Sequence, residues 1–521
     1  MGLSPWIVIA WLALVDCACP GNGRDCKALE QDEGDKAALG LLQMSQVKPP
    51  PPLTSLPVPP HWQQQLQDAL PGLLNFPPLE GPPPVECDLE NPTDQGCPLA
   101  AMERGRVYGV LTGGETICLS GEAYKFQVVK RDPDKLLYYF QGGGACWDFF
   151  SYNIPLSAPR FCLNGTHALS PKCQEGSTGL CTKTVSFSGL HGIFDGSNPN
   201  NPYKDHTIVL LPYCSGDIFA GNAVQHWAIP SRKQPTGKVK QHGFHNAQAV
   251  LKWVAPQFQR LKSLVLGGFS AGALGVAWWG GKLLETLQRE GTRTVVIADS
   301  FMGASYPLAS RFQIENFLFK TWNTCDTGVL DSEMQRRCNR GTLQLSDLWL
   351  SQMNANPLVS FTTINSKEDA VQIAFEVLLC RTAGFHDCAS MTPAQYYYSV
   401  NGLLGKYFRH AVNYQAFLID GVFHTYTELR EFYTANPLSP FGNVTVPPIT
   451  FFNMTVGPLG PHPASPKLVE WLGAVTCRRP LTCKYVCIGP SRSSSLGPVE
   501  GSPWLKYCDE CVRNEHPVMW R

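Results

Sequence analysis

The sequence predicts an α/β protein in which a mostly parallel sheet is flanked by helices and followed by a disulfide-rich C-terminal extension. Three observations favour this class. Short apolar runs alternate with stretches of helical length, as in sheets whose parallel strands are joined by helices. A Gly-x-Ser-x-Gly motif stands between one such run and one such stretch. Twenty cysteines in 521 residues are typical of a chain that folds in an oxidising compartment.

The chain divides by composition into four parts. Residues 1–19 contain an uncharged apolar core that ends in small residues, which predicts a secretory signal peptide, although no basic residue precedes the core. Residues 20–86 are rich in proline, which favours extended chain, so we expect a linker. Residues 87–476 are expected to form the compact α/β domain, and residues 477–521 a cysteine-rich extension. The predicted location is outside the cell.

Charge and glycosylation motifs fit this location. The formal net charge is zero and no long basic block occurs, so we expect no nucleic-acid partner. Residues 263–281 are uncharged and long enough to cross a bilayer, but their glycines and the serine motif favour a buried strand that leads into a buried helix. We therefore expect no stable membrane insertion. Sequons at Asn164, Asn443 and Asn453 predict glycosylation.

The predicted sheet and helices follow from the apolar pattern. Seven runs are expected to be strands, at 124–129, 135–140, 207–211, 263–266, 294–298, 358–364 and 414–419. Helices are expected at 245–253, 271–287 and 392–398.

Residues 268–272 read Gly-Phe-Ser-Ala-Gly, the pattern of a nucleophile elbow. In such an elbow the serine occupies a tight turn from strand to helix, and the glycines remove Cβ atoms that would clash there. The predicted strand before the motif and the predicted helix after it fit this geometry. Ser270 is therefore the candidate nucleophile.

Three consecutive glycines, Gly142, Gly143 and Gly144, follow another predicted strand. Such a run lets backbone N–H groups approach a substrate and stabilise a developing oxyanion. A phosphate-binding loop is the alternative, but neither a G-x-G-x-x-G pattern nor a Walker lysine is present.

Together these motifs resemble the pectin acetylesterase and Notum family of secreted serine carboxylesterases. The resemblance covers residues 100–475 and rests on five stretches in order: FQGGGACWD, LLPYCSGDIFAGN, HGFHNAQAVLKWV, GGFSAGA and VIADSFMG. It implies an α/β-hydrolase-like fold, a Ser-Asp-His triad and no metal or organic cofactor. By matched position it makes Ser270 the nucleophile, and the N–H groups of Gly143, Gly144 and Ala271 the oxyanion hole.

The candidate base is His424, which follows the last predicted strand, where an α/β hydrolase carries its histidine on a loop. His386 and His410 precede that strand and are expected to be partly buried, hydrogen-bonded structural residues.

The candidate acid is Asp369. It lies in a stretch that resembles the family segment in which asparagine and serine lead to the triad aspartate and then to a glutamine. Glu368, Asp420 and Asp299 remain alternatives, and Asp299 is also expected to brace the loops of the site.

The last cysteines raise the question of a metal. Cys483, Cys487, Cys508 and Cys511 have the spacing of a zinc ribbon. In a secreted chain disulfides are the favoured interpretation, so we expect no metal.

The expected function is hydrolysis of an acyl ester, with an acetyl ester of a polysaccharide as the favoured substrate. No stretch of the sequence plainly supplies the deep apolar lining that a long acyl chain requires. A Notum-like deacylase of a lipidated protein is the alternative. A serine peptidase or lipase, and an inactive binding protein on the same scaffold, are hypotheses from other classes.

Overall fold

The computed structural model describes residues 84–94, 96–119, 121–148, 151, 191–226, 238–303, 310–382, 391–440, 449–451, 454–456, 467–477 and 486–488. The predicted signal peptide, almost all of the linker and most of the C-terminal extension lie outside these residues. So do His386 and the three predicted glycosylation sites, Asn164, Asn443 and Asn453.

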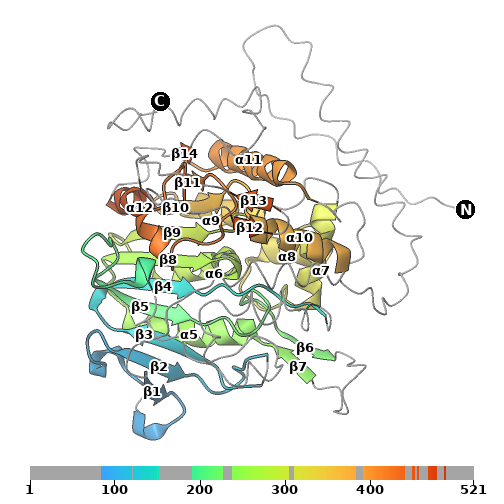
Figure 1. Ribbon diagram of the computed structural model, residues 1–521. Coiled ribbons are helices and arrows are strands. Elements are labelled where there is room, and N and C mark those ends of the chain that lie inside the picture. The colour runs from blue at the N-terminus through green and yellow to red at the C-terminus, as the bar shows by residue number, and fades with distance from the viewer. Residues whose placement is uncertain are drawn as a thin grey trace, which may run out of the picture. The chain divides into compact units, whose positions relative to one another are not determined.

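A ten-stranded sheet forms the centre of the domain, in the order β1-β2-β3-β5-β4-β8-β9-β10-β11-β14 (Figure 1). Its strands are β1 (Val85–Asp88), β2 (Val107–Leu111), β3 (Lys125–Val129), β4 (Asp132–Phe140), β5 (His206–Leu211), β8 (Ser263–Phe269), β9 (Arg293–Asp299), β10 (Ser360–Ser366), β11 (Tyr414–Ile419) and β14 (Val486–Ile488). From β5 to β14 every neighbouring pair is parallel, whereas β3 is antiparallel to β2 and to β5. The predicted α/β class with a mostly parallel sheet is confirmed.

All seven predicted strands are present, with their ends moved by a few residues. The sequence analysis missed the edge strand β1, which lacks a continuous apolar run, and its neighbour β2, whose short apolar run is interrupted by a glycine. It also missed two short antiparallel pairs, β6 (Ala223–His226) with β7 (Lys238–Gln241) and β12 (Ile449–Phe451) with β13 (Met454–Val456). The sheet continues into the segment assigned to the extension, because β14 pairs with β11.

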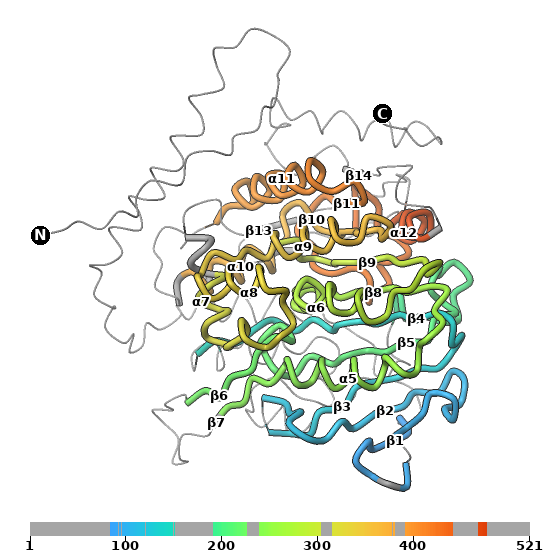
Figure 2. The backbone as a smooth tube through the Cα atoms, turned by 180° about the vertical axis from the view of Figure 1, so that it is seen from behind, coloured from blue at the N-terminus to red at the C-terminus, as the bar shows by residue number. Residues whose placement is uncertain are grey.

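Helices cover both faces of the sheet. They are α5 (Gly243–Gln257), α6 (Ala271–Leu287), α7 (Ser310–Thr321), α8 (Ser332–Arg340), α9 (Leu345–Ala355), α10 (Ala370–Thr382), α11 (Pro393–His410) and α12 (Leu468–Cys477). Figure 2 shows α5, α6, α9 and α11 in front of the sheet. The three predicted helices are α5, α6 and α11, and α6 has the predicted bounds.

The core lies in two layers because successive strand residues point to opposite faces. In β4, Leu136, Tyr138 and Phe140 pack with residues of α5, α6, α9 and α11. Leu137 and Tyr139 of the same strand pack in the other layer, with residues of α12.

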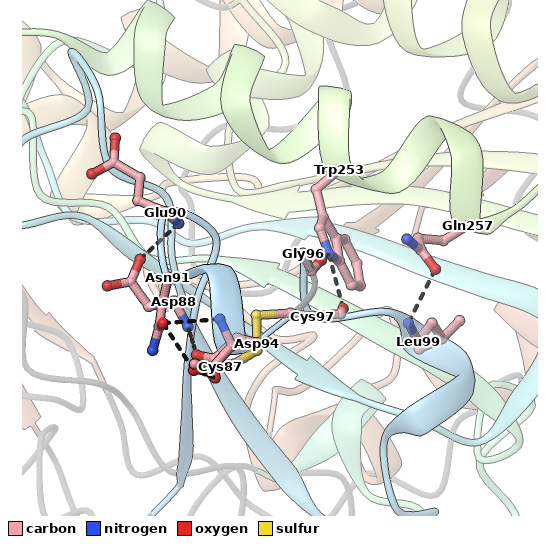
Figure 3. The surroundings of a disulfide bond; sticks show 11 residues. Cys87, Asp88, Glu90, Asn91, Asp94, Gly96, Cys97, Leu99, Trp253 and Gln257 are labelled. Carbon is pink, nitrogen blue, oxygen red and sulfur yellow. Dashed lines mark hydrogen bonds between the residues drawn. A yellow bond between two sulfur atoms is a disulfide. The ribbon is translucent and has the colours of Figure 1, made fainter.

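Disulfides fasten the first part of the sheet. Cys87 is bonded to Cys97, and the segment that follows is held against α5 (Figure 3): Trp253 Nε1 donates to the carbonyl of Cys97 at 3.1 Å, and Leu99 N donates to Gln257 Oε1 at 3.0 Å. Further bridges join Cys118 to Cys214 and Cys325 to Cys338.

Among the described residues, one group gathers three atoms of metal-ligating type, and it consists of Cys87, Asp94 and Cys97. Both of its sulfurs belong to a disulfide, so neither is a thiolate that could bind a cation. Of the described helices, none combines the length and apolar character needed to cross a bilayer.

Candidate active site

Ser270 occupies a strained turn between β8 and α6. Its backbone has φ 53° and ψ −123°, a region that residues with a Cβ rarely adopt. Its N–H donates to the carbonyl of Asp299 at 2.8 Å, and its side chain is half-buried. A Cβ on Gly268 would collide with the carbonyl of Gly272, and a Cβ on Gly272 with that of Phe140. The two glycines of the motif are therefore what allows α6 to leave β8 so closely.

His424 lies on the loop after β11 and is held by the carboxylate that follows β10. Its Nδ1 is 2.8 Å from Asp369 Oδ2. The Asp369 side chain is fully buried, and its Oδ1 accepts from the backbone N–H groups of Val371 and Gln372 at 3.0 and 2.9 Å. Gln372 Nε2 also donates to Oδ2 at 2.8 Å. These hydrogen bonds hold the Asp369 carboxylate in the position from which it binds the imidazole of His424.

The second ring nitrogen of His424, Nε2, is buried and has no hydrogen-bond partner among the described residues. Ser270 and His424 line the same pocket. The nitrogen is therefore available to a hydroxyl or a substrate group inside that pocket.

The pocket encloses about 810 Å³ of empty space, part of it open to solvent. Its lining is mostly apolar, and the apolar side chains are Ala145, Ile218, Ala271, Leu274, Phe301, Leu318, Phe319, Trp322, Leu345, Val371, Phe375 and Leu379. Two buried carboxylates, Glu315 and Glu376, also line it. Glu315 accepts from the backbone N–H of Leu345 at 3.1 Å, at the first turn of α9.

This lining corrects an expectation of the sequence analysis, in which no segment supplied a deep apolar wall. Val371, Phe375 and Leu379 recur every four residues of α10 and therefore share one face of the helix. Other parts of the wall come from α6, α7 and α9. The spacing in α10 was the signal that could have revealed part of the pocket.

The glycine loop reaches the same pocket. Gly144 has φ 77° and lines it, as does Ala271, the first residue of α6. The N-terminus of a helix carries free N–H groups and a partial positive charge, both favourable to an anion. Gly143 is buried next to Gly144.

Of the four candidate carboxylates, Asp369 has a hydrogen bond to the His424 ring. Asp420 forms a buried ion pair with Lys367, with Nζ 2.5 Å from Oδ1. Asp299 accepts hydrogen bonds from the loop that follows His424. Glu368 is half-buried, and its backbone N–H donates to the carbonyl of Gly421.

The structure also places His410 and Trp147. His410 ends α11 and is exposed, so the expectation of partial burial is wrong; a residue in the last turn of a helix can reach solvent even when the helix packs on the core. Trp147, which follows the glycine loop, packs edge to face on Phe375 with ring centroids 5.6 Å apart. The indole thus supports a side chain of the pocket wall.

A family model described as pectinacetylesterase matches residues 112–388, just over half of the chain. The chain belongs to the pectinacetylesterase family. This confirms the resemblance found from the motifs, and as a member of the family the chain is a hydrolase of the carboxylesterase type.

Solved structures similar to this pectinacetylesterase-family chain include two crystal forms of the Wnt deacylase Notum from Drosophila. One shares 18% identity, with 64% of this chain and 88% of that chain covered and a TM-score of 0.42. The other shares 18% identity, with coverages of 62% and 86% and a TM-score of 0.40. A likeness of this size says nothing about the substrate. No curated protein matches the chain.

Proposed function

We propose that the protein is a secreted serine carboxylesterase in which Ser270 is the nucleophile, His424 the base and Asp369 the acid. The observation that carries this proposal is the hydrogen bond between Asp369 and His424, next to a serine elbow that opens into the same pocket. The disulfides of the domain support an extracellular location, because such bonds persist in oxidising compartments.

In the proposed reaction, the Ser270 hydroxyl attacks the ester carbonyl while His424 Nε2 accepts its proton. Asp369 holds the ring by Nδ1 and stabilises the imidazolium that forms. The N–H groups of Gly143, Gly144 and Ala271 stabilise the oxyanion. His424 then gives the proton to the leaving alcohol, and water releases the acyl group from Ser270 by the same steps. None of these steps requires a metal or organic cofactor.

The pocket favours an acyl chain longer than acetyl. The lining residues of α10 run from Val371 to Leu379, a length of about 12 Å at 1.5 Å per helical residue. At about 1.5 Å per C–C bond, a chain of at least eight bonds is needed to follow that wall. We therefore propose the deacylase alternative of the sequence analysis as the first candidate. Its substrate is an ester of a long acyl chain, and an acetyl ester comes second.

An acetyl ester of a polysaccharide remains the second candidate, and the description of the family supports it. Both candidates use the same three side chains, so the reaction and the acyl group can be tested separately.

The reaction is tested by labelling with a fluorophosphonate and by ester turnover. We expect Ser270→Ala and His424→Ala to lose turnover by at least about a thousandfold, because the members of a triad act as a unit. Asp369→Asn should lower turnover more than Asp420→Asn does. Turnover by folded Ser270→Ala within about tenfold of the parent would contradict the assignment.

The acyl group is tested with p-nitrophenyl esters of two to sixteen carbons, run beside acetylated pectin and acetylated xylan. Each buried methylene contributes about 0.8 kcal/mol, so kcat/KM should rise about fourfold per methylene until the pocket is full. Phe375→Ala should lower kcat/KM for the long esters and leave kcat/KM for the acetate ester unchanged. Acetate release from either polymer, with no gain from longer chains, would favour the polysaccharide esterase instead.

A further inference from the structure

We propose that Asp299 is a positioning residue that links the loop carrying His424 to the nucleophile elbow at Ser270. This inference rests on the proposed function. Asp299 ends β9, next to β8 on one side and β10 on the other, and its side chain is fully buried. Its backbone carbonyl accepts from the N–H of Ser270 at 2.8 Å. The elbow is thus hydrogen-bonded directly to this residue.

The carboxylate of Asp299 holds the other half of the site. Its Oδ2 accepts from Tyr426 N at 2.8 Å, from Thr427 N at 2.7 Å and from Thr427 Oγ1 at 2.6 Å. These donors lie two and three residues after His424. One side chain therefore sets where the histidine loop leaves the sheet.

Ser300 adds a second link to the same loop. Its Oγ donates to Asp299 Oδ1 at 2.8 Å and accepts from Thr425 N at 2.8 Å. Ser300 and Thr425 both have positive φ, at 57° and 68°, which residues with a Cβ adopt only where neighbouring contacts hold them. Three consecutive backbone N–H groups after His424 are therefore bound by Asp299 or by the serine beside it.

A second buried acid, Glu428, lies in the same loop. It offers a control that separates the effect of removing a carboxyl group from the effect of losing the hydrogen bonds to the loop. Burial, followed by the charge of Asp299, raises the pKa of Glu428 well above its usual value. Burial also raises the pKa of Asp299, but four donors face its oxygens and favour its ionised form. Two such acids do not both ionise, so Asp299 carries the charge and Glu428 the proton. Tyr139 from β4 and Glu431 also face this pair.

The test compares Asp299→Asn with Glu428→Gln and Asp132→Asn. In the first variant the side chain loses its charge. Its amide NH₂ faces either the Ser300 hydroxyl or the N–H groups of Tyr426 and Thr427, so in both orientations the hydrogen bonds that hold the loop are weakened. In the second variant, glutamine mimics the protonated Glu428. The third variant changes Asp132, which starts β4 at the opposite end of the parallel strands, where its carboxylate binds Asp134 N and Lys135. Each variant is assayed well below its own unfolding temperature.

We expect Asp299→Asn to lose about a hundredfold in kcat and in fluorophosphonate labelling rate, with KM unchanged, because a displacement of about 1 Å misaligns the base. Glu428→Gln and Asp132→Asn should match the parent. Amide hydrogen exchange in residues 421–428 should be faster in Asp299→Asn alone.

A folded Asp299→Asn with the kcat and the exchange of the control variants would overturn the proposal. If this variant does not fold, Ser300→Ala and Thr427→Val, which each remove one hydroxyl donor, should lower kcat without changing KM, and parental kcat in both would overturn it as well. A parent that neither labels nor turns over esters would refute the proposed function instead, while the exchange measurement would still decide whether Asp299 holds the loop.

Discussion

At the scale of the residue, similar side chains have different roles because their surroundings differ. Asp299 ends a strand of the sheet, Asp369 and Asp420 follow strands, and all three are buried. Asp369 is hydrogen-bonded to an imidazole, and Asp299 accepts hydrogen bonds from backbone N–H groups. Asp420 forms an ion pair with the ammonium of Lys367. A carboxylate in this fold is therefore defined by the donor that packing brings to it.

A buried histidine makes the stability of the fold depend on pH. His206 in β5 lies against the ring of Tyr203, and its Nε2 is 2.9 Å from Ser263 Oγ. Burial, together with the charge of Lys135, lowers its pKa from 6.5 to about 4. The folded state therefore keeps the ring neutral where the unfolded state protonates it.

We expect His206 to cost the fold about 3 kcal/mol of unfolding free energy as the pH falls from 6.5 to about 4, because protons then bind the unfolded chain. Above pH 6.5 the ring is neutral in both the folded and the unfolded state, so this cost vanishes. His206→Gln should lack this component of the pH dependence, as measured by urea unfolding at pH 7 and pH 4. Equal losses in parent and variant would show that the histidine titrates normally in the folded state.

At the scale of the element, the passage from β8 to α6 depends on the absence of side chains. Gly268 and Gly272 lie against backbone carbonyls, so no rotamer change can make room for a Cβ. Both ends of the turn that carries Ser270 are constrained in this way. The conformation of the serine is thus a property of the strand, the turn and the helix together.

Two glycine substitutions within helices should have opposite effects. Gly272→Ala places a methyl group against the carbonyl of Phe140 and should lower the unfolding free energy by at least about 2 kcal/mol, with loss of esterase activity. Gly402→Ala, in α11 with open space around it, should raise stability by about 0.5–1 kcal/mol at full activity. Thermal unfolding of both variants measures the contrast. A tolerated Gly272→Ala would mean that α6 can move away from β4.

At the scale of the whole molecule, the site forms because neighbouring parallel strands end at one edge of the sheet. The glycine loop follows β4, Ser270 follows β8, Asp299 ends β9, Asp369 follows β10 and His424 follows β11. These five strands are consecutive neighbours in the sheet. Crevices at the carboxyl ends of such strands are where α/β folds bind ligands.

Disulfides should stabilise the whole domain by an amount that grows slowly, as the logarithm of the length of chain that each one closes. Cys118–Cys214 spans 96 residues and Cys325–Cys338 spans 13. From chain entropy we expect Cys118→Ala with Cys214→Ala to cost about 5 kcal/mol and the second double variant about 3 kcal/mol. Guanidinium unfolding of the two variants tests this order, and a larger loss from the shorter bridge would show that local packing outweighs loop length.

The sequence by itself determined the features that depend on neighbouring residues. Apolar runs predicted the central strands, and the Gly-Phe-Ser-Ala-Gly segment predicted the strand, turn and helix around Ser270, because a nucleophile elbow is built within one short stretch. The motifs also led to the family before any geometry was known.

Only the tertiary structure decided which acid meets His424 and what lines the pocket. Asp369 and His424 are 55 residues apart and meet because β10 pairs with β11. The pocket wall draws on segments from Gly144 to His424, and each segment contributes too few apolar side chains to stand out. The hydrogen bond and the wall both depend on how distant segments pack, and no local pattern in the sequence records that packing.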